Sequence, residues 1–145
     1  MVSGKINPGL LINRLKTCSI YLFVAWALII MIVSSIPSVP TLRIRAGAIS
    51  FRLDYLTHAA IYVILAFLGY LSFTNSDLIL RSRRFILITL ALILFAVIDE
   101  FHQKYIPGRT FNPADLASNI TGIIISLALC LKIFGSRNKI TGKHT

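Results

Sequence analysis

Four of the chain's five acidic residues lie in three short stretches that also carry histidine, tyrosine or amide side chains. In the first stretch, Asp54, His58 and Tyr62 are four residues apart, a spacing that places them on one face of a helix. A carboxylate beside an imidazole can transfer protons or ligate a metal ion. The chemistry open to this stretch therefore ranges from acid–base catalysis to the binding of a polar ligand.

The other two stretches combine acids with amides. Asp99 and Gln103 share a helix face, and Glu100 is three residues before Gln103, so it lies near the same face. Asp115 and Asn119 are four residues apart and define a third polar stripe. If three helices present these stripes at one level, the polar groups form a single site.

A turn is predicted between the second and third stretches. Pro107-Gly108 fits the central pair of a type II turn, because Pro sets φ and Gly accepts a positive φ. Arg109 then lies at the edge of the site, where it can fold over the acids or meet an anion. Asn112-Pro113 is typical of a helix N-cap followed by the first helical position. Adjacent acids repel, so Asp99 or Glu100 is expected to pair with Arg109 or to be protonated.

The elements that carry these stripes follow from composition. Of 145 residues, 56% are hydrophobic and 14% charged, which excludes an ordinary water-soluble domain. The charge clusters separate four apolar segments: Thr17–Ile36, Leu53–Phe73, Phe85–Tyr105 and Ala114–Phe134. Each has about the 20 residues that a helix needs to cross a membrane. The sequence therefore predicts an all-α polytopic membrane protein, a bundle of four transmembrane helices in a lipid bilayer.

The third apolar segment sets the depth of the acids. Its uninterrupted part, Phe85–Ile98, has about 14 residues and reaches only ~21 Å, short of the ~30 Å of hydrocarbon. The helix must therefore continue through Asp99, Glu100 and Gln103. This continuation places two acids and an amide one or two turns below a membrane surface.

The basic residues predict the orientation. The chain has 15 Lys and Arg and a net charge of +10, but these residues lie in clusters between apolar segments, which argues against a nucleic-acid partner. Most of them flank the side of the two termini, including the cluster Arg81, Arg83 and Arg84, although the outer loop 37–52 is also basic. We therefore expect a plasma or inner membrane protein with a cytoplasmic basic N-terminus (1–16), a membrane domain (17–134) and a cytoplasmic basic tail (135–145).

Each polar residue also has a purely structural interpretation. Asp54 can act as an N-cap, and Asp115 can interact with the positive end of a helix dipole. His58 and Tyr62 can be packing residues, and Asn119 can bridge two helices through a hydrogen bond. Their joint placement at one membrane face is what favours a functional site, because ionisable groups inside a membrane are costly.

The polar residues together resemble a known family, the VanZ-like membrane proteins. The downstream motifs D-E-x-x-Q, P-G-R and D-x-x-x-N-x-x-G match Asp99 to Gln103, Pro107 to Arg109, and Asp115 with Asn119 and Gly122. The upstream motif D-x-x-x-H-x-x-x-Y matches Asp54, His58 and Tyr62, and Ser34-Ser35 resembles the serine-ending first span. The resemblance implies a small bacterial membrane protein acting at the outer face of the cell envelope. The family's namesake is associated with low-level resistance to teicoplanin, a glycopeptide that binds cell-wall precursors.

The preferred hypothesis is an outward-facing site that recognises an envelope component such as a lipid-linked cell-wall precursor, with Arg109 binding an anion. Its residues are Asp54, His58, Asp99, Glu100, Gln103, Arg109, Asp115 and Asn119.

Two other functions remain open. A membrane-embedded enzyme would use Asp99 or Glu100 with His58 as acid and base, and Ser34 or Ser35 as the only candidate nucleophiles. A metal version with Asp54, His58 and Glu100 has generic spacing, so neither a metal nor another cofactor is expected. A proton-coupled transporter is disfavoured because the polar groups occupy only one half of the helices.

Overall fold

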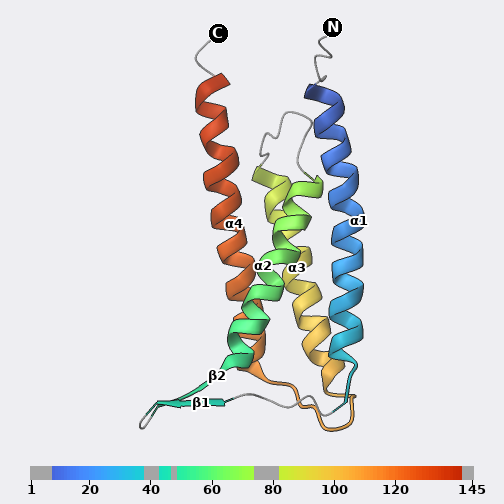
Figure 1. Ribbon diagram of the computed structural model, residues 1–145, viewed down its shortest axis with the longest axis vertical. Helices are drawn as coiled ribbons and strands as arrows, with labels where there is room; N and C mark the ends of the chain where they lie inside the picture. The colour runs from blue at the N-terminus through green and yellow to red at the C-terminus, as the bar shows by residue number, and fades with distance from the viewer. Residues whose placement is uncertain (1–7, 38–42, 47–48, 74–81, 142–145) are drawn as a thin grey trace, which may run out of the picture.

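The computed structural model describes residues 8–37, 43–46, 49–73 and 82–141, and its main elements are four long helices (Figure 1). They are α1 (Pro8–Ser34), α2 (Leu53–Phe73), α3 (Ser82–Gln103) and α4 (Pro113–Thr141). Parts of the predicted cytoplasmic ends, 1–7 and 142–145, and of the basic cluster, Arg81, lie outside the described residues. The predicted order of four helices is confirmed.

Each helix contains a stretch long and apolar enough to cross a membrane. The four spans have 21 or 22 residues: Asn13–Ser34, Leu53–Phe73, Arg83–Gln103 and Pro113–Ile133. The third span ends at Gln103, so the predicted continuation through the acids is confirmed. Large hydrophobic side chains are exposed along the bundle, for example Ile32 and Leu94. A surface of this kind suits lipid rather than water.

Two helices are longer than the apolar segments that predict them. Helix α1 begins at Pro8, before the expected Thr17, and α4 continues beyond Phe134 to Thr141. Both extensions carry basic residues, and long Lys and Arg side chains can reach the membrane surface from a continuing helix. The first part of the predicted basic tail, residues 135–141, thus continues α4.

A short hairpin lies in the loop 37–52, where the sequence analysis predicts no element. Strands β1 (Arg43–Ala46) and β2 (Ile49–Arg52) pair antiparallel, with Arg43 opposite Arg52. Both strands alternate apolar with polar or small residues, a period of two that indicates strand structure. The hairpin leads directly into α2 at Leu53.

The helices are arranged so that their polar ends meet. Helix α2 makes its most extensive contact with α4 and a smaller one with α1, while α3 contacts α4, α2 and α1. In Figure 1, the beginning of α1 and the end of α4 lie at one end of the bundle. The hairpin and the α3–α4 connection lie at the other end, which we call the polar end because Asp54, Asp99, Glu100 and Asp115 lie in the helix turns next to it.

Close contact between α2 and α4 depends on a glycine. A Cβ atom at Gly122 would overlap the backbone carbonyl oxygen of Ala59 and approach the Val63 nitrogen at 3.1 Å. The absence of a side chain therefore lets the two backbones touch, as small residues do between membrane helices. The buried core includes side chains of α2, α3 and α4: Tyr62, Leu65, Ala66, Tyr70, Leu92, Ala96 and Ile123.

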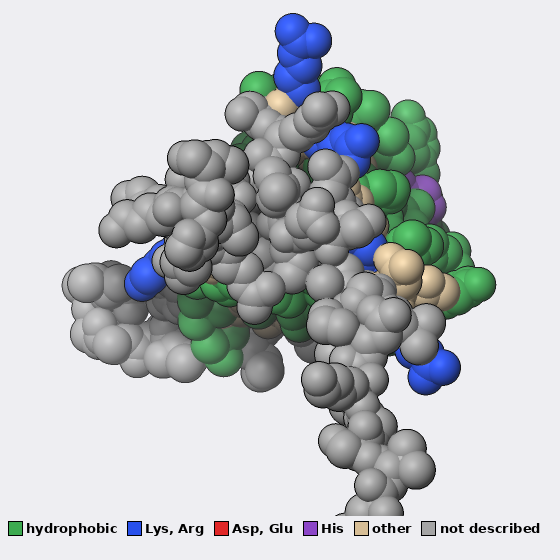
Figure 2. All heavy atoms as spheres, turned by 90° about the horizontal axis from the view of Figure 1, so that it is seen from above, with side chains coloured by type: hydrophobic (Ala, Val, Ile, Leu, Met, Phe, Trp, Pro, Cys, Tyr) green, Lys and Arg blue, Asp and Glu red, His purple; other side chains and the backbone are tan. Residues whose placement is uncertain are grey.

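Basic side chains are concentrated at the end opposite the polar end. Arg14, Arg83, Arg84 and Lys132 are exposed there. Figure 2 views the molecule from that end and shows Lys and Arg side chains around it, with hydrophobic side chains on the visible flank. One end of the bundle therefore holds most of the described basic residues, and the opposite end holds Asp54, Asp99, Glu100 and Asp115.

Candidate functional site

The connection between α3 and α4 has the predicted turn. The Arg109 amide donates a hydrogen bond to the Ile106 carbonyl at 3.1 Å, and Gly108 has φ of 77°. A positive φ at the third residue of a turn that begins with Ile106-Pro107 is what a type II turn requires. The turn reverses the chain and holds Arg109 at the edge of the bundle.

The beginning of α4 is held by two polar side chains. Oδ1 of Asn112 accepts a hydrogen bond from the Ala114 amide at 3.0 Å, so the predicted N-cap is confirmed. Oε1 of Glu100 accepts one from the Asn112 amide at 2.9 Å. Glu100, which is fully buried, therefore attaches the end of α3 to the start of α4. Part of its role is structural.

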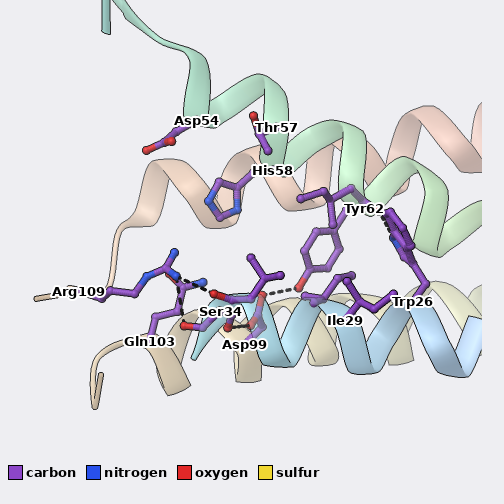
Figure 3. Close-up of a pocket in the computed structure, with 13 residues that line it drawn as sticks. Trp26, Ile29, Ser34, Asp54, Thr57, His58, Tyr62, Asp99, Gln103 and Arg109 are labelled. Atoms are coloured by element: carbon purple, nitrogen blue, oxygen red, sulfur yellow. Dashed lines mark hydrogen bonds between the residues drawn. The ribbon is translucent and has the colours of Figure 1, made fainter. Parts of the chain in front are cut away.

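A pocket of about 180 Å³ lies between α1, α2 and the end of α3 (Figure 3). One end is polar and the other apolar: in Figure 3, Asp54, Gln103 and Arg109 lie toward one side, and Trp26 and Ile29 lie toward the other. The lining residues are Trp26, Ile29, Ile30, Val33, Ser34, Asp54, Thr57, His58, Ile61, Tyr62, Asp99, Gln103 and Arg109.

Asp99 lies at the centre of the pocket wall and joins three helices. Its Oδ1 accepts a hydrogen bond from Ser34 Oγ on α1, and its Oδ2 accepts one from the Tyr62 hydroxyl on α2 at 3.0 Å. All three side chains are buried, with exposed fractions of 1–5%. Tyr62 also packs against Phe95, so its ring has an apolar contact and its hydroxyl a polar partner.

Arg109 has partners other than the acids expected for it. Its Nη1 donates hydrogen bonds to the carbonyl oxygens of Val33 at 3.3 Å and Ser34 at 3.2 Å. These carbonyls belong to the last turn of α1, where helix carbonyls lack intrahelical partners and a cation is favoured by the helix dipole. The expected pair with Asp99 or Glu100 is therefore replaced by a cap on the end of α1.

His58 connects the pocket to a second polar layer. Its Nδ1 lies 3.0 Å from Oδ1 of Asn119 on α4, and an amide oxygen only accepts, so His58 is the donor. Asn119 and Asp115 are buried and lie outside the pocket lining, as does Glu100. Glu100 lies near both Asp115 and His58. We call Glu100, Asp115 and Asn119 the back layer.

The structure thus divides the eight predicted site residues into two groups. Asp54, His58, Asp99, Gln103 and Arg109 line the pocket. The back layer is joined to this group by the hydrogen bond between Asn119 and His58. Oε2 of Glu100, Oδ1 of Asp115 and Nδ2 of Asn119 are buried without a hydrogen-bond partner in the described ranges. The sequence predicts that these residues lie at one end of the bundle, whereas their separation into two layers depends on how each helix is rotated.

Comparison with known proteins identifies the family. Residues 18–135 match the VanZ/LLP1 family. The chain belongs to this family. The match includes all four membrane spans apart from the first turns of α1, and it contains every residue of the pocket and the back layer. The resemblance inferred from the motifs is therefore confirmed. No curated protein and no solved structure matches the chain.

The site of this VanZ/LLP1 protein offers little support for a metal ion. Among the side chains that the structure describes, no group of three or more His, Cys, Asp or Glu residues could hold one. The proposed ligands Asp54 and His58 line the pocket, whereas Glu100 belongs to the back layer. These three residues therefore do not form the ligand set that the metal alternative requires.

Sequence reasoning missed the apolar wall of the VanZ/LLP1 pocket. Trp26, Ile30 and Ser34 are four residues apart, so this face of α1 is visible in the sequence as a helical stripe. The indole N–H of Trp26 donates to the Ile61 carbonyl at 3.1 Å and fixes the ring between α1 and α2. The indole N–H of a tryptophan in an apolar helix requires a hydrogen-bond partner, so Trp26 was the residue from which a contact between α1 and another helix could have been predicted.

Proposed function

We propose that this VanZ/LLP1 protein binds an amphipathic component of the bacterial cell envelope in the outer half of the plasma membrane. The observation that carries the proposal is the two-ended pocket in Figure 3. Its apolar wall of Trp26, Ile29 and Ile61 suits a hydrocarbon chain. Its polar end, with Asp54 and Gln103, suits hydroxyl and amide groups.

The pocket is accessible from the side of the bundle. Ile29 and Val33 line it, and each side chain is 46% exposed on the surface that faces lipid. A ligand that is already in the bilayer can therefore enter between α1 and α2 without passing through water. A lipid-linked cell-wall precursor has the required long hydrocarbon chain and polar group, and the glycopeptide association of the family's namesake concerns the same class of molecule.

The distribution of basic residues supports an outward-facing site with both termini in the cytoplasm. Cytoplasmic flanks of membrane helices are enriched in Lys and Arg. Among the described residues, Arg14, Lys16, Arg83, Arg84, Lys132, Arg137 and Lys139 lie toward the end that holds the termini, and the polar end has Lys104, Arg109 and the hairpin residues Arg43, Arg45 and Arg52. The orientation agrees with a ligand in the outer leaflet.

The hydrogen-bond partners of Ser34, one of the two candidate nucleophiles, bear on the enzyme alternative. Ser34 donates its hydroxyl hydrogen bond to Asp99, and Nδ1 of His58 is bonded to Asn119. Among the described residues, Ser34 therefore has no direct hydrogen bond to a histidine, but the carboxylate that accepts from it is Asp99, the acid–base residue of the enzyme alternative, so the two-ended pocket rather than this contact favours binding. The described hydrogen bonds instead hold Ser34, Asp99 and Tyr62 together as a rigid pocket wall.

Occlusion of the pocket tests this proposal. Ile29→Trp places a larger side chain at the apolar wall and is expected to weaken binding of a purified lipid-linked disaccharide-pentapeptide at least tenfold. In cells with matched protein levels, the same variant is expected to remove any protection against teicoplanin that the wild-type protein gives. Ile32→Trp is the control, because Ile32 is exposed on the same helix but lies outside the pocket lining. Equal binding by the two variants would contradict the proposal.

A further inference from the structure

A second hollow lies beside the pocket, on the α3–α4 connection. Its volume is about 460 Å³, and it is lined by Phe101, Lys104, Arg109, Thr110 and Phe111. The rings of Phe101 and Phe111 are in contact, with centroids 5.0 Å apart. Arg109 lines both the pocket and this hollow, which we call the basic hollow. None of the eight residues predicted from the sequence lines the basic hollow except Arg109.

We propose that the basic hollow binds the phosphate group of an anionic lipid. This inference rests on the proposed function, because the hydrocarbon chain of the same lipid would occupy the pocket. The phosphate group of the ligand would then lie in the basic hollow and its hydrocarbon chain in the pocket. The polar end of the pocket includes the carboxyl groups of Asp54 and Asp99, which repel an anion. The described lining of the basic hollow includes two basic residues and a threonine, and it includes no acid.

The hydrogen-bond donors of the residues that line the basic hollow suit the oxygen atoms of a phosphate group. A guanidinium group has five N–H donors, and the α1 carbonyls take up those of Arg109 Nη1, which fixes the group in position. Lys104 is exposed, and in the described ranges its ammonium group has no carboxylate partner. With the Thr110 hydroxyl, these groups supply charge-assisted hydrogen bonds to a phosphate.

The depth of the basic hollow matches that of a lipid headgroup. The third membrane span ends at Gln103, so Lys104 follows it at the membrane surface, and Thr110 precedes the fourth span, which begins at Pro113. Phe101 lies in the last turn of the third span and is 51% exposed, where its ring can contact acyl chains. Cations at this level attract anionic headgroups. A free anion in solution would gain nothing from the adjacent apolar surfaces.

Trp26 provides a test, because it is the chain's single tryptophan and lines the pocket. The full-length protein is placed in phosphatidylcholine nanodiscs that contain a small fraction of chain-brominated phosphatidic acid or of the equally brominated, uncharged diacylglycerol. Bromine quenches indole fluorescence on contact. We expect saturable quenching by both lipids, with half-saturation at a roughly tenfold lower fraction of the phosphatidic acid.

Charge-matched variants locate the phosphate. Lys104→Gln is expected to raise the half-saturating fraction of phosphatidic acid about fivefold and to leave that of diacylglycerol unchanged. Lys132→Gln removes the same charge from an exposed position at the opposite end of the bundle and is expected to change neither. Inorganic phosphate is expected not to displace the lipid, and displacement would assign the hollow to free phosphate and overturn the inference.

Two further outcomes separate this inference from the proposed function. Saturable quenching that is equal for the two brominated lipids would overturn the phosphate site and leave the amphipathic pocket intact. Quenching that rises in proportion to the lipid fraction, with no saturation for either lipid, would overturn both.

Discussion

Gly122→Ala is expected to destabilise the helix bundle by about 1–3 kcal/mol, because the new methyl group has no space. Its Cβ would overlap the Ala59 carbonyl oxygen, which is backbone and cannot rotate away. Relief requires α2 and α4 to separate, and this contact is the most extensive in the bundle. The separation would also stretch the hydrogen bond between His58 and Asn119, one turn away.

This effect is measured as the free energy of unfolding of purified Gly122→Ala relative to the wild type. Gly69→Ala is the control. Gly69 is a buried helical glycine on α2, but a Cβ there would meet the ring of Phe23 at 3.2 Å, a side chain that can move by a few tenths of an ångström. The control is therefore expected to lose less than half as much stability. Equal losses would show that backbone contact at Gly122 does not hold α2 against α4.

Asp99→Leu is expected to lower the free energy of unfolding by about 1–3 kcal/mol and to loosen the pocket wall. The change leaves two buried donors, Ser34 Oγ and the Tyr62 hydroxyl, without their acceptor. These donors belong to α1 and α2, so their loss weakens the attachment of both helices to α3. Asp99→Asn keeps the size of the side chain and one acceptor oxygen, and it is expected to cost less.

A double-mutant cycle with Ser34→Ala distinguishes hydrogen bonding from packing. If the bond between Ser34 and Asp99 stabilises the protein, the double variant should lose less stability than the sum of the two single variants. Hydrogen bonds between membrane helices contribute about 0.6 kcal/mol on average, so the coupling is expected near or above that value. Strict additivity would mean that the two side chains act independently.

Much of the fold follows from local chemistry in the sequence. The apolar lengths predict the four spans, and the short third segment correctly requires a helix that continues to Gln103. Pro107-Gly108 and Asn112-Pro113 specify a turn and a cap through their own backbone preferences, and both are observed. These features depend on neighbouring residues only.

The features that sequence analysis missed depend on contacts between distant residues. Helical spacing places Glu100 one position round the helix from Asp99, but it does not show that Asp99 bonds to α1 and α2 while Glu100 bonds to the start of α4. Likewise, Arg109 is within reach of several partners, and the rotation of α1 decides that its last carbonyls are the ones bound. The apolar wall around Trp26 could not be predicted, because an apolar side chain in a membrane span can face either lipid or a pocket, and the packing of α1 against α2 decides which.

The most direct test of the amphipathic pocket is photo-crosslinking in nanodiscs. A lipid-linked cell-wall precursor with a photoreactive group in its hydrocarbon chain is activated with the full-length protein, and the labelled residues are mapped by mass spectrometry. The two-ended pocket predicts labels concentrated on Trp26, Ile29 and Ile61, and their loss in Ile29→Trp. Labels spread evenly over exposed residues outside the pocket, such as Leu94 and Leu131, would contradict it.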